Sequence, residues 1–281
     1  MAWCGTRKLA WALLAAFAVS SIAGQVAWGD DAKAVVVVGP VDPPQHRRTR
    51  AYRAEAEQAA QALEQGGYAV VRLFHPDATW DRLRAAAAGA QVLVYYGHGN
   101  GYGWMGYTDP AWVNGLCLSD PDDPDALRAG AGVPGGNSRQ LAELRLAPDA
   151  LVVVVHACYA AGSGESDRTP VGIETASARV ERYAEAFFQA GAGTYLATSY
   201  VGAAPDYLRR WVQGEPSQEL FLRLLGGDNV HRGPGMMLAE ERSRPGDPYP
   251  WVSAWVQRPV AVASAPPAQE AAAERRQTSP E

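Results

Sequence analysis

The chain has 281 residues, of which 47% are hydrophobic and 20% charged, and its formal net charge at pH 7 is −5. This is the composition of a globular protein long enough to bury one substantial hydrophobic core. The negative charge argues against a nucleic-acid-binding protein, which normally carries a basic stripe.

The first 29 residues are predicted to be a secretory signal peptide. Arg7 and Lys8 precede an apolar stretch, 9–22, which is followed by small residues, and this is the order of regions in such signals. Cleavage is expected after Ala23 or Gly29. The stretch is shorter than the roughly 20 apolar residues of a membrane span, so we expect a secreted protein without stable membrane insertion. An uncleaved anchor is the alternative.

Short apolar runs alternate with helical patterns along most of the chain. Strands are expected at 34–38, 68–73, 91–96, 150–155 and 194–197, and helices at 50–65, 79–88, 138–144, 178–190, 205–211 and 218–225. Such alternation predicts an α/β fold with a mostly parallel sheet and helices on both faces. We expect one domain over residues 30–258, followed by a disordered tail, 259–281, that is rich in Ala, Pro and charge.

Two long loops, 99–137 and 159–175, interrupt this rhythm. The first contains several aromatic residues and four aspartates, at positions 120, 122, 123 and 125, and we interpret it as an ordered flap. The aspartates are a candidate calcium site, although they lack the Gly and terminal Glu of an EF-hand loop. We otherwise expect no cofactor. Without the signal, the chain keeps Cys117 and Cys158, and a disulfide between them is a further possibility in an oxidising compartment.

Two of the predicted strands end in residues with useful chemistry. His98 follows the strand at 91–96, and Cys158 follows the strand at 150–155. Adjacent strands lie about 4.8 Å apart, and the carboxyl edge of an open α/β sheet is where sites are built. A nucleophilic cysteine needs a base and donors for an oxyanion. His98 can supply the base, and the backbone N–H groups of Gly99 and Cys158 can supply the donors.

This arrangement resembles the caspase-like cysteine peptidases (clan CD), which include caspases, gingipains, clostripain, legumain and separase. The resemblance rests on His98-Gly99 and Ala157-Cys158, each directly after a strand and in this order. It is closest to uncharacterised secreted bacterial caspase-like proteins with similar segments. It implies a caspase-like three-layer sandwich and a peptidase acting on peptide or protein substrates through a thioester intermediate. Cys158 would be the nucleophile, His98 the general acid/base and Gly99 the oxyanion donor.

The chain departs from the caspase pattern around the cysteine, where His156 stands in place of a glutamine and Tyr159-Ala160 in place of Arg-Gly. The residue specificity is therefore open. Candidate substrate-binding residues are Glu165, with Asp167 nearby, and Ser199 and Tyr200 after the last parallel strand.

Three other interpretations of the same residues remain. The first alternative is a catalytically inactive secreted domain, in which flap aromatics such as Trp104 bind a peptide or glycan. Cys158 is unavailable if it is bonded to Cys117. Finally, His98, His156 and Cys158 are suitable zinc ligands, provided that the strand persists far enough for the last two to share a face.

Overall fold

The computed structural model describes residues 32–100, 113–122, 137–200, 202–241 and 248–259. The predicted signal peptide, the C-terminal tail from residue 260 and two parts of the predicted flap lie outside these residues. Among the residues described, no helix is long and apolar enough to cross a membrane.

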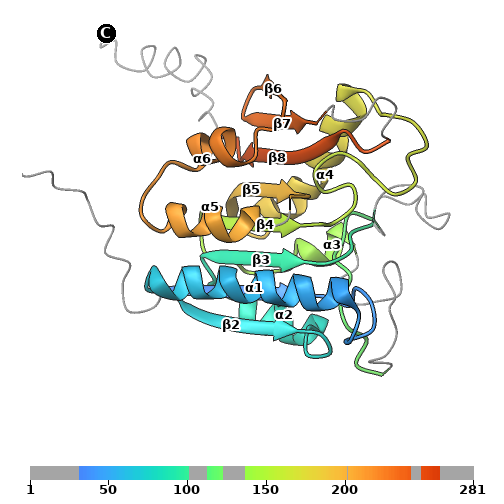
Figure 1. Cartoon of the computed structure of the whole chain (residues 1–281). Helices are drawn as coiled ribbons and strands as arrows, with labels where there is room; N and C mark the ends of the chain where they lie inside the picture. Colours follow the sequence, from blue (N-terminus) through green and yellow to red (C-terminus); the bar gives the residue numbers. More distant parts are fainter. Residues whose placement is uncertain (1–31, 101–112, 123–136, 201, 242–247, 260–281) are drawn as a thin grey trace, which may run out of the picture.

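The described residues form one eight-stranded sheet in the order β2-β1-β3-β4-β5-β8-β7-β6 (Figure 1). Its strands are β1 (Lys33–Val38), β2 (Ala69–Phe74), β3 (Val92–Tyr96), β4 (Ala150–Val155), β5 (Ala192–Thr198), β6 (Asn229–Gly233), β7 (Met236–Glu240) and β8 (Trp251–Gln257). Strands β1 to β5 are parallel, and their order, 2-1-3-4-5, is that of a flavodoxin-like doubly wound sheet. All five predicted strands are confirmed to within two residues at each end.

The antiparallel end of the sheet is not predicted from the sequence. Strand β8 pairs antiparallel with β5, and β7 and β6 extend the sheet as a hairpin. The hairpin is short, and Gly235 at its turn has a left-handed φ of 67°. Strand β8 is buried on both faces except at its last residue, so it lacks the in–out alternation that marks a half-exposed strand.

Helices cover both faces of the sheet, as predicted. They are α1 (Arg47–Gln65), α2 (Trp80–Ala87), α3 (Ser138–Leu141), α4 (Ile173–Gln189), α5 (Ala203–Trp211) and α6 (Ser217–Leu224). Alternate side chains of β1 divide between two cores: Val36 and Val38 pack with α1, α5 and α6, whereas Val35 and Val37 pack with α2, α3 and α4. The α/β class, with a mostly parallel sheet between two helical layers, is therefore confirmed (Figure 1).

Helix α3 ends at Leu141 rather than at residue 144, and two helices begin at least three residues earlier than predicted. Helix α1 begins at Arg47 rather than at residue 50, because the His46 side chain caps it by accepting the N–H of Arg48 at 3.3 Å. Helix α4 begins at Ile173 rather than at residue 178, with Gly172 as its N-cap. The second long loop is therefore shorter than predicted.

Candidate active site

The turn after β3 carries His98, Gly99 and Asn100, and hydrogen bonds hold it on several sides. The Tyr95 hydroxyl donates to the His98 carbonyl at 2.7 Å, and the Cys117 N–H donates to the same carbonyl at 3.1 Å. Gly99 forms an antiparallel bridge with Leu116. The turn is thus a short extension of the sheet, although the sequence predicts that the long loop 99–137 begins here.

The loop after β4 carries Cys158 and folds back tightly on itself. His156 and Tyr159 have left-handed φ angles of 61° and 69°, which few non-glycine residues adopt. The Tyr159 N–H donates to the Ser163 carbonyl at 2.6 Å, and the buried Tyr195 hydroxyl donates to the Ala160 carbonyl at 3.0 Å. Cys158 therefore sits in a fixed turn between two strained residues, a pattern that is frequent at functional sites.

The turn at His98, Gly99 and Asn100 (the histidine turn) and the turn that carries Ala157 and Cys158 (the cysteine turn) are in direct contact. Strand register aligns Tyr96 with Val155, the last residues of β3 and β4. Beyond them, a Cβ atom placed on Gly99 would lie 2.7 Å from the Cys158 carbonyl oxygen and 2.9 Å from the Ala157 Cβ. The structure thus brings His98-Gly99 and Ala157-Cys158 together at the carboxyl edge. The catalytic roles of these residues stay predictions.

The His98 imidazole is partly exposed, and its Nε2 atom lies 3.3 Å from the Val41 carbonyl oxygen. Because a carbonyl only accepts hydrogen bonds, Nε2 carries the proton in this contact, and the lone pair of a neutral ring is on Nδ1. Among the described residues, no hydrogen bond joins this imidazole to Cys158. The loop after β1, which sequence reasoning did not connect with the site, therefore fixes the tautomer of the candidate base.

Both described cysteines are free thiols, so the disulfide alternative is not formed in this structure. Burial raises the pKa of the Cys117 thiol to about 12. Burial, followed by the Glu165 and Asp167 carboxylates, also raises the pKa of the partly exposed Cys158, while the backbone N–H groups of Glu165 and Cys158 lower it. Cys158 is therefore protonated at neutral pH in the free protein and needs a base when it attacks.

Glu165 is exposed, and its backbone carbonyl accepts a 3.4 Å hydrogen bond from Tyr249. Since its carboxylate raises the pKa of Cys158, we expect Glu165→Gln to lower that pKa and to speed alkylation of Cys158 at neutral pH. The measurement is the rate of iodoacetamide labelling against pH, read by peptide mapping. Glu174→Gln, which removes an exposed carboxylate from the first turn of α4, is the control. A profile for Glu165→Gln that matches the control would contradict this expectation.

Asp167, in contrast, already has a protein partner. Both of its carboxylate oxygens accept hydrogen bonds from Arg179 at 2.7 Å, and one also accepts the Gly164 N–H. The negative charge of Asp167 is therefore compensated by a cation of the protein itself. Arg179 also donates to the Gly162 carbonyl and lies 5.1 Å from the centre of the Tyr159 ring, so this pair closes the cysteine loop.

Arg179→Met should destabilise the protein by about 2–4 kcal/mol, because it leaves the Asp167 carboxylate buried without its cation. The Asp167 side chain is only 4% exposed and that of Arg179 is 19% exposed. The measurement is urea-induced unfolding. Arg82→Met is the control, since Arg82 and Asp77 pair with more than half of each side chain exposed, and we expect a loss below about 1 kcal/mol. An equal loss of unfolding free energy in both variants would show that the Arg179–Asp167 ion pair does not stabilise the loop.

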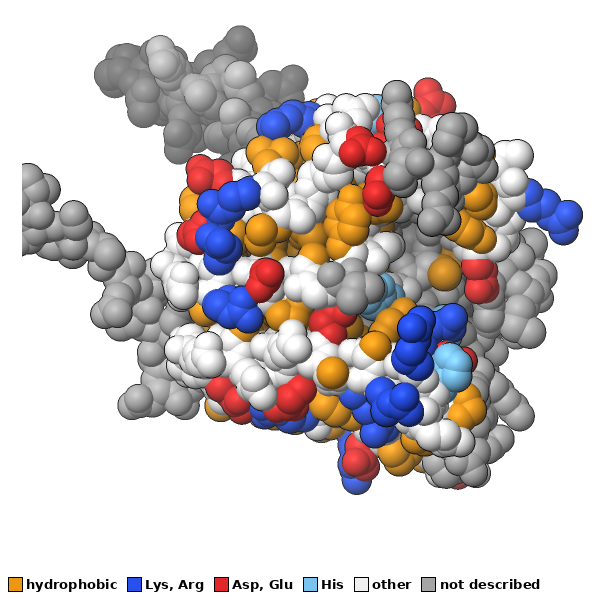
Figure 2. Space-filling model, viewed as in Figure 1, with side chains coloured by type: hydrophobic (Ala, Val, Ile, Leu, Met, Phe, Trp, Pro, Cys, Tyr) orange, Lys and Arg blue, Asp and Glu red, His pale blue; other side chains and the backbone are white. Residues whose placement is uncertain are grey.

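Ser199 and Tyr200 are placed in different surroundings. Ser199 is exposed and lines a pocket of about 510 Å³, which we call the α1 pocket; its other lining residues are His46, Arg47, Arg48, Ala51, Tyr52 and His156. Figure 2 shows Lys and Arg side chains gathered over the first turns of α1. Tyr200 does not line this pocket. Its hydroxyl faces Gly227, and burial, followed by the Glu241 carboxylate, raises the pKa of Tyr200 to about 12.

Sequence reasoning missed a buried polar cluster beneath the α1 pocket. The His156 ring stacks on Tyr52 with their centres 4.5 Å apart, and its Nε2 atom lies 3.6 Å from Glu55 Oε2. Three buried atoms of this cluster have no hydrogen-bond partner among the described residues: Glu55 Oε1, Tyr96 Oη and His156 Nε2. The only sequence signal was Glu55 itself, a carboxylate on the alanine-rich face by which α1 packs on the sheet.

No three His, Cys, Asp or Glu side chains gather as a metal site in the part of the chain that the structure describes. His98, His156 and Cys158, the zinc alternative, are therefore not assembled as ligands here. Of the four flap aspartates, Asp123 and Asp125 lie outside the described residues, and calcium binding stays a prediction.

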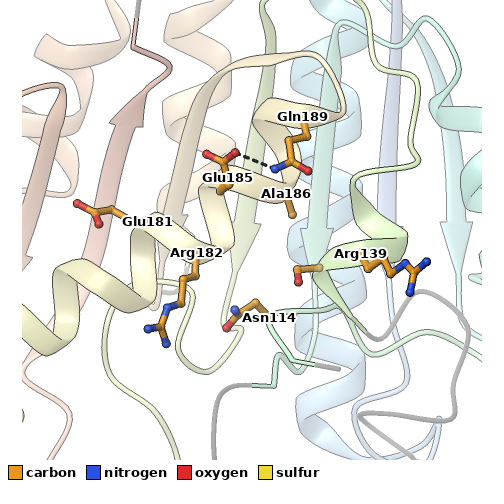
Figure 3. A pocket seen from close by; sticks show the side chains of 8 residues that line it. Asn114, Arg139, Glu181, Arg182, Glu185, Ala186 and Gln189 are labelled. Atoms are coloured by element: carbon orange, nitrogen blue, oxygen red, sulfur yellow. Dashed lines mark hydrogen bonds between the residues drawn. The ribbon is translucent and has the colours of Figure 1, made fainter. Parts of the chain in front are cut away.

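A second pocket, of about 540 Å³, lies between α3 and α4 and does not include the candidate residues. Its lining residues are Asn114, Ser138, Arg139, Glu181, Arg182, Glu185, Ala186 and Gln189 (Figure 3). Glu185 accepts a 2.8 Å hydrogen bond from Gln189, and charges of both signs are present. Its described lining contains no cysteine and no histidine, so we place the candidate chemistry at the carboxyl edge of the sheet.

Comparison with known proteins gives no match to a family model and none to a curated protein sequence. Solved structures with a similar arrangement include the Arg-specific cysteine proteinase gingipain R (15% identity, 64% of this chain and 35% of that chain, TM-score 0.35). A secreted C11 cysteine protease from Bacteroides thetaiotaomicron, in complex with an irreversible peptide inhibitor, is also similar (10% identity, 80% and 66%, TM-score 0.32). So is a flavodoxin from Streptococcus pneumoniae (15% identity, 65% and 96%, TM-score 0.34).

Proposed function

We propose that the chain is a secreted caspase-like cysteine peptidase that hydrolyses peptide bonds through Cys158 and His98. The observation that carries the proposal is the packing of Gly99 against the Cys158 carbonyl, because it brings the turn that carries His98 into contact with the turn that carries the free thiol Cys158. Secretion rests on the sequence of residues 1–29, which lie outside the described residues.

The proposed reaction begins with proton transfer from the Cys158 thiol to Nδ1 of His98, because the raised pKa keeps the thiol protonated until a base is engaged. The sulfur then attacks the scissile carbonyl carbon. The backbone N–H groups of Gly99 and Cys158 are the proposed donors to the oxyanion that forms. The oxyanion then collapses, the scissile C–N bond breaks as the imidazolium of His98 gives its proton to the leaving amine, and a thioester remains on Cys158.

Water completes the cycle. His98, neutral again, removes a proton from a water molecule, whose oxygen attacks the thioester carbon. Collapse of the second oxyanion breaks the C–S bond and releases the carboxylic acid product, and the His98 imidazolium returns its proton to the Cys158 sulfur. The partial burial of Cys158 supports this scheme, because a site with little water strengthens the interactions of the oxyanion with its donors.

The α1 pocket is the proposed place for a substrate side chain, with Ser199 at its wall and Glu165 on the cysteine loop. Arg47 and Arg48 are the charged residues among its described lining, and Arg48 also pairs with the Asp42 carboxylate. This charge favours an acidic or neutral side chain over a basic one. Tyr200 faces Gly227 and is not among the described lining residues of this pocket, so we assign it no part in holding this side chain.

The test of this proposal is a peptide library, varied at one position, incubated with the purified mature protein and analysed by mass spectrometry. We expect cleavage that prior treatment with iodoacetamide abolishes. Intact peptides after long incubation with a folded protein, with and without calcium, would contradict the proposal. That result would favour the alternative of a non-catalytic binding domain, whose proposed aromatic Trp104 lies outside the described residues.

A further inference from the structure

Two buried tyrosine hydroxyls, which no motif identifies, hold the histidine turn at both of its ends. Tyr95, on β3, is fully buried, and its hydroxyl lies 2.7 Å from the His98 carbonyl oxygen and 2.9 Å from the Cys117 carbonyl oxygen. It also accepts the Cys117 N–H at 3.0 Å. The Tyr95 hydroxyl therefore links the start of the histidine turn, at His98, to the segment around Cys117 that pairs with this turn.

Tyr183 comes from α4, on the helical layer beneath the same edge, and is also fully buried. Its hydroxyl lies 2.7 Å from the Asn100 carbonyl oxygen and 3.1 Å from the Gly115 carbonyl oxygen. A Cβ atom on Gly99 would be 2.6 Å from this hydroxyl and 2.7 Å from the Cys158 carbonyl oxygen. The hydroxyl thus occupies the place where the histidine turn, its pairing segment and the cysteine turn meet.

We propose that Tyr95 and Tyr183 are positioning residues for the candidate dyad. Neither ring reaches solvent, so neither is expected to touch substrate. Their hydroxyls fix the carbonyls on either side of Gly99, and thereby the direction of the Gly99 N–H and of the His98 imidazole relative to Cys158. This inference rests on the proposed function, because it assigns the tyrosines to that same site.

The chemistry of the two groups suits this role. Burial raises the pKa of each phenol well above its usual value of about 10, so both remain protonated donors throughout the neutral range. Replacement by phenylalanine keeps the ring and its packing but removes the donor. The His98 carbonyl would keep the Cys117 N–H and the Asn100 carbonyl would keep the Asn114 N–H. We therefore expect a loosened turn rather than an unfolded protein.

The experiment compares Tyr95→Phe and Tyr183→Phe with Tyr207→Phe in the mature protein. Tyr207 is a matched control, because it is fully buried and its hydroxyl bonds Ser217 on the opposite face of the sheet. The first readout is the imidazole ¹⁵N–¹H spectrum, in which His98→Ala assigns the His98 signal. The second is the split between kcat and KM for a peptide that the wild type cleaves.

We expect the His98 signal to shift or broaden in Tyr95→Phe and Tyr183→Phe but not in Tyr207→Phe. We also expect kcat to fall about tenfold or more at nearly constant KM, because small displacements of catalytic groups have large effects on rate. An unchanged His98 signal in both site variants overturns the inference. Absence of turnover in the wild type overturns the proposed function instead, and the spectrum still decides the positioning role.

Discussion

Cys158→Ala is expected to lower peptide hydrolysis by about 10⁴-fold or more, to the level of the uncatalysed reaction in the assay. The reason is that the proposed intermediate is a thioester, and among the described residues the only other cysteine, Cys117, is buried with a pKa raised to about 12. The measurement is the steady-state rate with the best library peptide, at equal concentrations of wild type and variant.

The fold should survive this change, because the Cys158 side chain is partly exposed and the loop around it is held by Arg179, Tyr159 and Tyr195. Circular dichroism and urea unfolding of the variant should therefore resemble those of the wild type. Cys117→Ala, which removes the other described thiol, is the comparison and should keep turnover within a few-fold. A Cys158→Ala variant that is folded and as active as wild type would rule out cysteine catalysis.

Gly99→Ala is the second change with a large expected effect. Its Cβ would lie 2.6 Å from the Tyr183 hydroxyl, 2.7 Å from the Cys158 carbonyl oxygen and 2.9 Å from the Ala157 Cβ. Two of these groups belong to backbone or to a short side chain that cannot swing away, so the histidine turn and the cysteine turn must move apart. We expect turnover to fall by about 100-fold and stability to fall by about 1–3 kcal/mol, as for other overpacked sites.

Gly172→Ala is the matched control for Gly99→Ala. An added Cβ at Gly172 would meet nothing within 4 Å, and this residue caps α4 with an ordinary φ of −69°. We expect both activity and the unfolding midpoint of the control to stay near those of the wild type. If Gly99→Ala turns over substrate as fast as Gly172→Ala, the contact between the two turns is not required for the chemistry.

The sequence predicts the parallel half of this fold well, because the patterns that mark each strand and helix lie within a few consecutive residues. Each of the five parallel strands is a short apolar run, and each intervening helix has an apolar face and end signals within a few residues. The antiparallel strands escape prediction, because β8 is buried on both faces and β6 and β7 are short and joined by a glycine turn. Such strands are defined by their partners rather than by their own pattern.

The candidate site likewise has a part that the sequence predicts and a part that it does not. That the strands ending before His98 and Cys158 lie side by side follows from strand order in a doubly wound sheet. The contacts that define the site chemically do not follow from it. Tyr183 meets Asn100 across 83 residues, and Glu55 approaches His156 across about a hundred. No local spacing encodes such contacts, and the pKa of Cys158 depends on where the loop carrying Glu165 closes.

The most direct test of the central claim is covalent capture at the candidate nucleophile. The mature protein, its His98→Ala variant and its Cys158→Ala variant are incubated with a peptidyl electrophile built on the best library sequence, quenched in acid and mapped by mass spectrometry. The account predicts one adduct, on Cys158, that forms much more slowly in His98→Ala and is absent from Cys158→Ala. Cleavage of the parent peptide without an adduct on Cys158, or labelling that proceeds equally fast without His98, would contradict it.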